Sequence, residues 1–135
     1  MTVVIDASVA MAWCFEDEAT DQTERLLEQV TTNGGVVPSV WALEVANVVV
    51  VAERRTRITR AHGERVLALL DRLPLEPAEA DPAPADLAAT AREHGLSAYD
   101  AAYLICALRE GLPLATLDRG LAAAARAAGV PLALS

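Results

Sequence analysis

The sequence of 135 residues contains no lysine, only two cysteines and only two histidines. The absence of lysine weighs against phosphoacceptor domains of the receiver type, which pair a lysine with the phosphoryl group. Cys14 and Cys106 lie far apart in apolar stretches, which indicates buried reduced thiols rather than a disulfide or a metal site. His62 and His94 have the surroundings of surface residues, and neither is placed to act as a general base.

Long hydrophobic runs are also missing. The longest apolar stretch, from Val45 to Ala52, is interrupted by Asn47 and is too short to cross a bilayer, and no basic segment precedes an apolar one near residue 1. We therefore expect a soluble, cytoplasmic protein that does not bind membranes. With 53% hydrophobic and 22% charged residues the chain has the composition of a folded protein. Its length fits one domain, residues 1–135.

The net charge of −8 is unfavourable for a nucleic-acid-binding protein, because phosphate affinity comes mostly from basic side chains. All eleven basic residues are arginines, and five of them crowd one short region: Arg54, Arg55, Arg57, Arg60 and Arg65. A solvated helix end and a basic turn explain this cluster slightly better than a substrate-binding patch does. An acidic site can still bind RNA, because a bound cation reverses the local potential.

Short apolar segments alternate with helical patterns along the chain. We predict strands over residues 2–5, 36–37, 73–75, 112–117 and 130–134. We predict helices over residues 9–15, 20–32, 40–55, 60–71, 85–93, 98–109 and 119–128, with an acidic loop at 16–18. The expected N-caps include Ser8, Ser39, Thr59 and Asp118. Short apolar strands separated by helices indicate a mostly parallel sheet covered on both faces, and such sheets bind ligands beyond the carboxyl ends of their strands.

Four acidic residues occur where a packing argument would not place them: Asp6 and Asp118 after apolar strands, Asp100 at the start of a helix, and Glu44 inside an apolar helix. If the chain folds so that these carboxylates converge, they repel one another and a cation is needed to neutralise them. Oxygen ligands without histidine or cysteine favour Mg²⁺, with Mn²⁺ as the alternative, over Zn²⁺. The acids therefore predict a metal site at which metal-activated water is the nucleophile.

Three of the acids also have a structural explanation. Asp118 is a good N-cap, and Ser97 with Asp100 has the pattern of a capping box, so each taken alone is explained about equally well by a structural role. The two roles are compatible, because both point a carboxylate toward a helix N-terminus. Asp6 could cap the helix that follows it, but Ser8 is the expected cap there, which favours a functional role for Asp6.

Glu44 is the most informative of the four acids. Its neighbours one helical turn away are Trp41, Asn47 and two valines, so it projects from a mostly apolar face. Glu24, with mostly polar neighbours, has the pattern of an ordinary surface acid. A carboxylate buried beside tryptophan and valine needs a cation or a hydrogen-bond donor, so we favour a ligand role for Glu44, oriented by Asn47, over a protonated core acid.

The acids stand in four motifs that follow one another along the whole chain. They are Val4-Ile5-Asp6-Ala7-Ser8-Val9 with Trp13, Pro38-Ser39 leading to Glu44-Val45-Ala46-Asn47, Leu96-Ser97-Ala98-Tyr99-Asp100-Ala101-Ala102-Tyr103, and Ala115-Thr116-Leu117-Asp118. In order and spacing these motifs resemble those of PIN-domain ribonucleases of the VapC toxin type. Each motif is weak by itself, and together they are specific.

The resemblance implies an α/β fold, a three-layer α/β/α sandwich around a mostly parallel sheet of about four or five short strands. It also implies a Mg²⁺-dependent endoribonuclease that cleaves tRNA, rRNA or mRNA, forms a homodimer, and is inhibited by a VapB-type antitoxin in a heterotetramer or larger complex. By matching positions, Asp6 and Asp100 are the surest metal ligands, and Glu44 and Asp118 complete the acidic pocket.

The same resemblance makes Ser8, Asn47 and Thr116 supporting polar groups of the site. Local capping or strand-end hydrogen bonding explains these three residues about equally well. Many relatives have lysine where this chain has Gly120, so a phosphate contact from that position is missing here. The alternatives that remain are a phosphoacceptor domain and a non-catalytic α/β regulatory domain.

Overall fold

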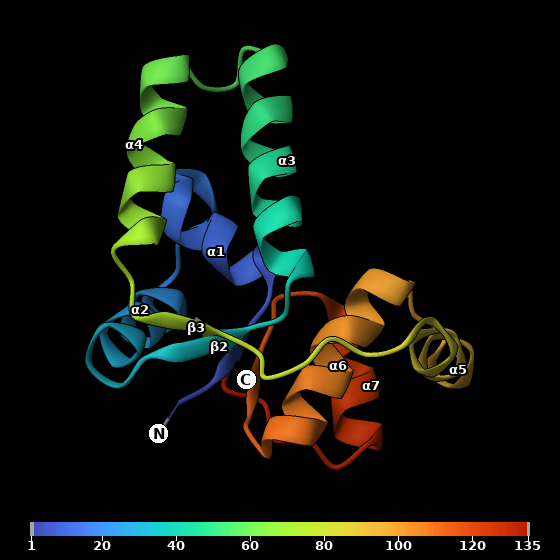
Figure 1. The fold of residues 1–135 in the computed structure, drawn as a ribbon. Helices are drawn as coiled ribbons and strands as arrows, with labels where there is room; N and C mark the ends of the chain where they lie inside the picture. The colour runs from blue at the N-terminus through green and yellow to red at the C-terminus, as the bar shows by residue number, and fades with distance from the viewer. Residues whose placement is uncertain (1, 135) are drawn as a thin grey trace.

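The computed structural model describes residues 2–134 (Figure 1). Its centre is a four-stranded parallel sheet, and the strands are β1 (Val4–Ile5), β2 (Gly35–Val37), β3 (Leu75–Pro77) and β4 (Leu114–Ala115). The strand order is β3-β2-β1-β4, so β1 lies between β2 and β4. The predicted α/β class with a mostly parallel sheet is confirmed.

Helices fill the connections between the strands. They are α1 (Ala7–Cys14), a 3₁₀ helix η1 (Glu16–Glu18), α2 (Asp21–Asn33), α3 (Val40–Arg54), α4 (Arg60–Asp71), α5 (Pro84–His94), α6 (Ala98–Glu110) and α7 (Arg119–Ala127). In Figure 1, α3 and α4 run side by side away from the sheet, and α5, α6 and α7 gather together beyond it. In the described part of the chain, no helix is both long and apolar enough to cross a membrane.

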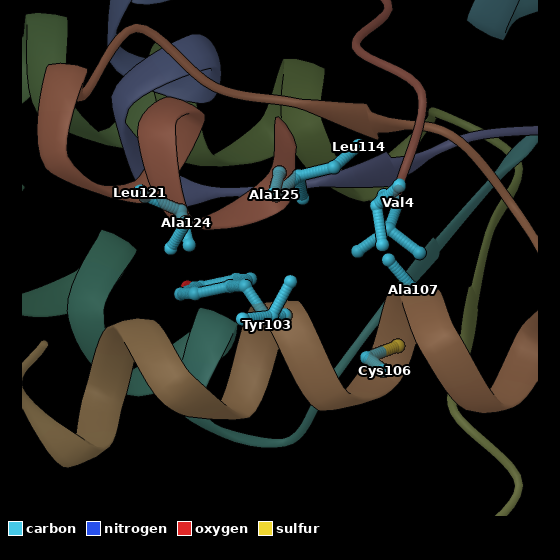
Figure 2. Packing of buried hydrophobic residues seen from close by; sticks show 10 residues of the cluster. Val4, Tyr103, Cys106, Ala107, Leu114, Leu121, Ala124 and Ala125 are labelled. Atoms are coloured by element: carbon cyan, nitrogen blue, oxygen red, sulfur yellow. The ribbon is translucent and has the colours of Figure 1, made fainter. Parts of the chain in front are cut away.

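The two faces of β1 contact different helices, because successive side chains of a strand point to opposite faces. On one face, Val4 packs in a buried cluster with Tyr103 of α6 and Leu121 of α7 (Figure 2). On the other face, Ile5 packs in a cluster with Leu26 of α2. Fully burying one such aliphatic side chain stabilises the fold by about 1.5–3 kcal/mol. The sheet is therefore the middle of three layers, as predicted.

The α3–α4 hairpin is attached to α1 by a third cluster that includes Met11, Val49 and Leu70. Its turn carries the predicted arginine cluster. Arg57 lies over the ring of Phe15, with its guanidinium carbon 4.3 Å from the ring centroid. The same guanidinium forms ion pairs with η1, at 3.1 Å from Asp17 and 2.9 Å from Glu18. At least this member of the arginine cluster is therefore engaged within the chain.

Two of the predicted N-caps are wrong, and two are confirmed. Asp6, rather than Ser8, caps α1, because its carboxylate accepts a hydrogen bond from the backbone of the third helical residue and Ser8 lies inside the helix. Ser39 occupies the N-cap position of α3 without capping it, since its hydroxyl donates to Asp81 instead, at 2.9 Å. Thr59 and Asp118 accept the expected capping hydrogen bonds of α4 and α7.

Two predicted strands are also corrected, and proline explains both differences. The third strand begins at Leu75, because Pro74 has no N–H to donate to a neighbouring strand. The segment 130–134 is not a strand, and only Leu132 forms an isolated bridge, to Leu114. Pro131 interrupts that segment, although its carbonyl still accepts from the Leu114 N–H at 2.9 Å. The acidic loop at 16–18 forms η1.

Gly35 is expected to be sensitive to any added side chain, because a Cβ there would lie 2.7 Å from Ile5 Cδ1 and 3.0 Å from Leu75 Cδ2. Gly35→Ala should lower the free energy of unfolding by about 1–3 kcal/mol, the usual cost of overpacking. Urea denaturation measures this loss. The exposed control Glu28→Ala should change it by less than about 0.5 kcal/mol, and an equally small change for Gly35→Ala would contradict the close packing of β1, β2 and β3.

Candidate active site

The site lies where the carboxyl ends of two parallel neighbours, β1 and β4, meet. Asp6 directly follows β1 and is only 4% exposed. Both of its carboxylate oxygens accept hydrogen bonds. Oδ1 accepts from the Ser8 hydroxyl at 2.6 Å and from the Val9 N–H at 3.1 Å, and Oδ2 accepts from the Thr116 hydroxyl. The carboxylate is therefore buried and fixed in orientation by three neutral donors.

Burial raises the pKa of Asp6, because a charged carboxylate is less well solvated inside the fold than in water. The hydrogen bonds from Ser8, Thr116 and Val9 act in the opposite direction, since they favour the charged form. The negative charge of Asp118 adds to the upward shift. The pKa remains above its ordinary value, so the fold holds Asp6 in a position where its charge is unfavourable without a cation.

The segment after β4 is joined to Asp6 through the same hydroxyl groups. Thr116 Oγ1 accepts from the Asp118 N–H at 3.0 Å, and Ser8 Oγ accepts from the Leu117 N–H at 2.9 Å. Asp118 itself is exposed and caps α7 by accepting from the Leu121 N–H at 2.8 Å. The structure therefore brings Ser8 and Thr116 into contact with Asp6. These hydrogen bonds also join the ends of β1 and β4, so they fit both a supporting role in the site and the purely structural role considered from the sequence.

Asp100 enters the site from α6. Ser97 caps this helix by accepting from the Asp100 N–H at 3.1 Å, as its sequence pattern predicts. The pKa of Asp100 is raised, mainly by burial and then by the negative charges of Asp118, Glu44 and Asp6. Asp100 thus lies close enough to the other three acids proposed from the sequence for their charges to affect it.

Glu44 reaches the site from α3, and its environment differs from the expected one. It is half-buried rather than buried, and its Oε1 accepts a hydrogen bond from the hydroxyl of Tyr103 at 2.6 Å. Burial and this hydrogen bond raise the pKa of Tyr103, so the phenol remains a donor. Asn47 is exposed and makes no hydrogen bond to Glu44 within residues 2–134. Tyr103 therefore orients Glu44 in the way expected of Asn47.

Sequence reasoning missed this role of Tyr103, although a signal for it was present. Tyr103 follows Asp100 by three residues, which places both on the same side of a helix. Figure 2 shows its ring extending from α6 between the helix and Ala124 of α7. A buried tyrosine hydroxyl usually needs a hydrogen-bond partner, and the acid on α3 was a candidate.

The donor set at this site fits a hard divalent cation. It consists of carboxylate oxygens, which Mg²⁺ and Mn²⁺ prefer, and it includes no histidine or cysteine. Over the described range, no three acidic, histidine or cysteine side chains stand close enough to form a ready-made metal cage. Mg²⁺ does not require one, because it commonly binds through one or two carboxylates and keeps several waters. Asp6 and Asp100 would suffice as direct ligands.

Comparison with known proteins places the chain among related sequences and folds. A family model described as "PIN domain" matches residues 3–127. The solved structure of PAE2754 from Pyrobaculum aerophilum is 26% identical, with a TM-score of 0.69 over 92% of this chain and 79% of that one. No curated protein matches this chain.

Two further solved structures share the fold at lower identity. FitAcB from Neisseria gonorrhoeae is 17% identical, with a TM-score of 0.68 over 98% of this chain and 96% of that one. VapBC2 from Rickettsia felis, solved bound to a DNA fragment from its promoter, is 15% identical, with a TM-score of 0.66 over 98% and 97% of the two chains.

Removing the charge of Asp100 should stabilise the metal-free protein. Its pKa in the folded state lies above the ordinary 3.8, so the wild type loses stability as the pH rises through that raised value. At neutral pH, Asp100→Asn should therefore raise Tm by a few degrees, and this gain should vanish below pH 3.8. Thermal unfolding in EDTA measures both effects. The exposed control Glu24→Gln should change Tm little, and a neutral-pH Tm equal to that of the wild type would refute the repulsion.

Removing the hydroxyl of Tyr103 should destabilise the fold, because Glu44 loses the hydrogen bond that orients its carboxylate. Tyr103→Phe keeps the buried ring and deletes the 2.6 Å hydrogen bond, so the free energy of unfolding should fall by about 1 kcal/mol. The matched control Tyr99→Phe removes an exposed hydroxyl and should have no effect. Urea denaturation of both variants, combined with Glu44→Gln in a double-mutant cycle, measures the interaction. Additive losses in that cycle would show that the two side chains do not interact.

Proposed function

Because this chain belongs to the PIN domain family, we propose that it is a Mg²⁺-dependent endoribonuclease and the toxin of a VapBC-type toxin–antitoxin pair. The observation that carries the proposal is the buried Asp6 carboxylate, held by the hydroxyls of Ser8 and Thr116 where β1 and β4 end, with Asp100 close enough for the charges of the other acids to raise its pKa. Such a group of acids favours the binding of a divalent cation, which is the usual requirement for hydrolysis of phosphodiester bonds. The fold shared with a protein named VapBC2 is consistent with this assignment.

In the proposed mechanism, Asp6 and Asp100 would hold Mg²⁺, and Glu44 and Asp118 would contribute directly or through water. Mg²⁺, or Mn²⁺ in its place, would supply an activated water nucleophile and neutralise the charge that develops on the phosphate. Ser8 and Thr116 keep the Asp6 carboxylate from rotating. The 3′-oxygen of the RNA leaves in line, so the products carry 5′-phosphate and 3′-hydroxyl ends, and the 2′-hydroxyl takes no part.

An open site suits a polymeric substrate. Asp118 is exposed and Glu44 is half-buried, so a phosphodiester can approach the acids without unfolding of the chain. Arg119 directly follows Asp118 in the chain and is exposed, whereas Gly120 has no basic side chain. Electrostatic attraction of RNA to a chain of net charge −8 must be local, and bound Mg²⁺ would add to it.

The proposal includes protein partners. Leu43 and Val50 of α3 and Leu69 of α4 are exposed apolar side chains on the projecting hairpin, a surface that a second protein chain could cover. We propose a VapB-type antitoxin and a second copy of this chain as partners, in a heterotetramer or larger complex. An arginine of the antitoxin could pair with the carboxylates of the site in place of the metal.

Two alternative functions were left open by the sequence, a phosphoacceptor domain and a non-catalytic regulatory domain. A phosphoacceptor domain has no support, because the chain belongs to the PIN domain family and contains no lysine. A non-catalytic regulatory domain would retain the fold and show no metal-dependent cleavage.

Asp6→Asn and Asp100→Asn should each lower cleavage by more than the roughly 10–100-fold typical of residues that only support a metal ligand. The assay is cleavage of total RNA by the purified chain, free of antitoxin, in Mg²⁺ and in EDTA, with sequencing of the new ends. Glu24→Gln, on the exposed face of α2, should cleave like the wild type.

Two results would count against the proposal. Wild-type rates in both aspartate variants would reject the metal site. A 2′,3′-cyclic phosphate at the new ends would reject hydrolysis by water and would indicate attack by the 2′-hydroxyl.

A further inference from the structure

A pocket of about 370 Å³ lies along the first turn of α6, the turn that also carries Asp100, although none of the four acids lines it. Tyr99 and Ala102 of α6 form one wall, Leu87 of α5 forms another, and Pro38 and Val40 lie where β2 leads into α3. Most of the lining is apolar. Tyr99 directly precedes Asp100 and lies about 100° around α6 from it, closer to the proposed metal site than Ala98 and Ala102, the other α6 residues of the pocket.

Tyr99 differs from the other tyrosine of this helix. Tyr103 is buried and donates to Glu44, whereas Tyr99 is 61% exposed at the edge of the pocket. A flat aromatic ring that is both exposed and next to an acidic site can stack on a nucleobase, and every base offers a face for such stacking.

The pocket also has a polar wall. Ser39 and Asp81 line it, and the Ser39 hydroxyl donates to Asp81 Oδ1 at 2.9 Å instead of capping α3. This hydrogen bond joins the start of α3 to the proline-rich loop before α5. Asp81 Oδ2 accepts no hydrogen bond from the described residues, which leaves an acceptor at the rim of an apolar pocket.

We propose that this pocket binds an unpaired base of the RNA, within a nucleotide or two of the scissile phosphate, and the inference rests on the ribonuclease function proposed above. The Tyr99 ring stacks on the base, and Asp81 accepts a hydrogen bond from the base edge. A phosphate would be repelled by Asp81, whereas a base is neutral, flat and carries N–H donors. A paired base could not enter, so the substrate is single-stranded at this point.

The same chemistry predicts a preference among bases. Adenine, cytosine and guanine each carry an exocyclic amine that can donate to Asp81. Uracil has no amine, and the carbonyl groups on both sides of its N–H would face the carboxylate. We therefore expect uracil to bind the pocket most weakly.

The test is the affinity of short fluorescein-labelled oligo-A, oligo-C, oligo-G and oligo-U, measured by fluorescence anisotropy in Ca²⁺, which takes oxygen ligands as Mg²⁺ does. Tyr99→Ala should weaken binding of all four by about 5- to 150-fold, the usual range for losing one base stack. Tyr99→Phe keeps the ring and should bind within about twofold of the wild type. Leu108→Ala, at an exposed apolar position of α6 outside the pocket, should bind like the wild type.

A second variant tests the polar wall. The wild type should bind oligo-U most weakly, and Asp81→Asn should reduce that discrimination, because an amide both donates and accepts. Equal affinity of the wild type for all four oligonucleotides would overturn the role of Asp81.

Cleavage in Mg²⁺ separates this inference from the proposed function. Tyr99→Ala should raise KM and change the preferred cleavage sites. Tyr99-dependent binding by a wild type that cleaves no RNA would support the pocket and reject the nuclease. A wild type that cleaves, with a Tyr99→Ala variant that binds and cleaves in the same way, would overturn the pocket. Loss of antitoxin affinity in that variant would then assign the pocket to a protein partner.

Discussion

The position of the Asp6 carboxylate determines how the acidic site is built. Asp6 follows the strand that lies between two others, caps α1, and accepts hydrogen bonds from residues on both sides of the β1–β4 junction. Its burial makes the charge unfavourable, so each donor that contacts it is needed to offset lost hydration. The chain segments after β1 and β4 are thereby held together by a group whose own charge the fold does not neutralise.

At this site, a carboxylate that caps a helix N-terminus points in the same direction as one that would bind a cation. In a parallel sheet, each strand leads into a helix whose N-terminus lies near the strand's carboxyl end. A side chain that caps such a helix points its oxygen atoms toward the space above the sheet. Asp6 and Asp118 both do so, and Asp100 stands one turn into a helix capped by Ser97. A structural role and a role in binding a cation therefore do not compete for these residues.

The sequence predicted what depends on local pattern and missed what depends on contacts between distant segments. Apolar strands between helices were enough to predict the parallel sheet. The acids at strand and helix ends singled out Asp6, Asp100 and Asp118, whose role in binding a cation stays a prediction. The hydrogen bonds of Ser39 and Tyr103 were missed, because their partners, Asp81 and Glu44, lie 42 and 59 residues away along the chain. Glu44 was expected to be buried because helical spacing shows neighbours on its own helix and not how much solvent reaches it.

The kind of donor found around the acids supports the proposal that a cation, rather than a side chain, neutralises their charge. Within residues 2–134, the ion pairs of the chain involve none of the four acids, and their hydrogen bonds come from hydroxyl and backbone N–H groups. Neutral donors fix the direction of a carboxylate but leave its charge, whereas an arginine would also neutralise it. Of the eleven arginines, all in the described part of the chain, none forms an ion pair with these acids, so their negative charge is left to a ligand from solution. The same charge would oppose the approach of RNA until that ligand is bound, so binding of the cation would have to precede productive binding of the phosphodiester.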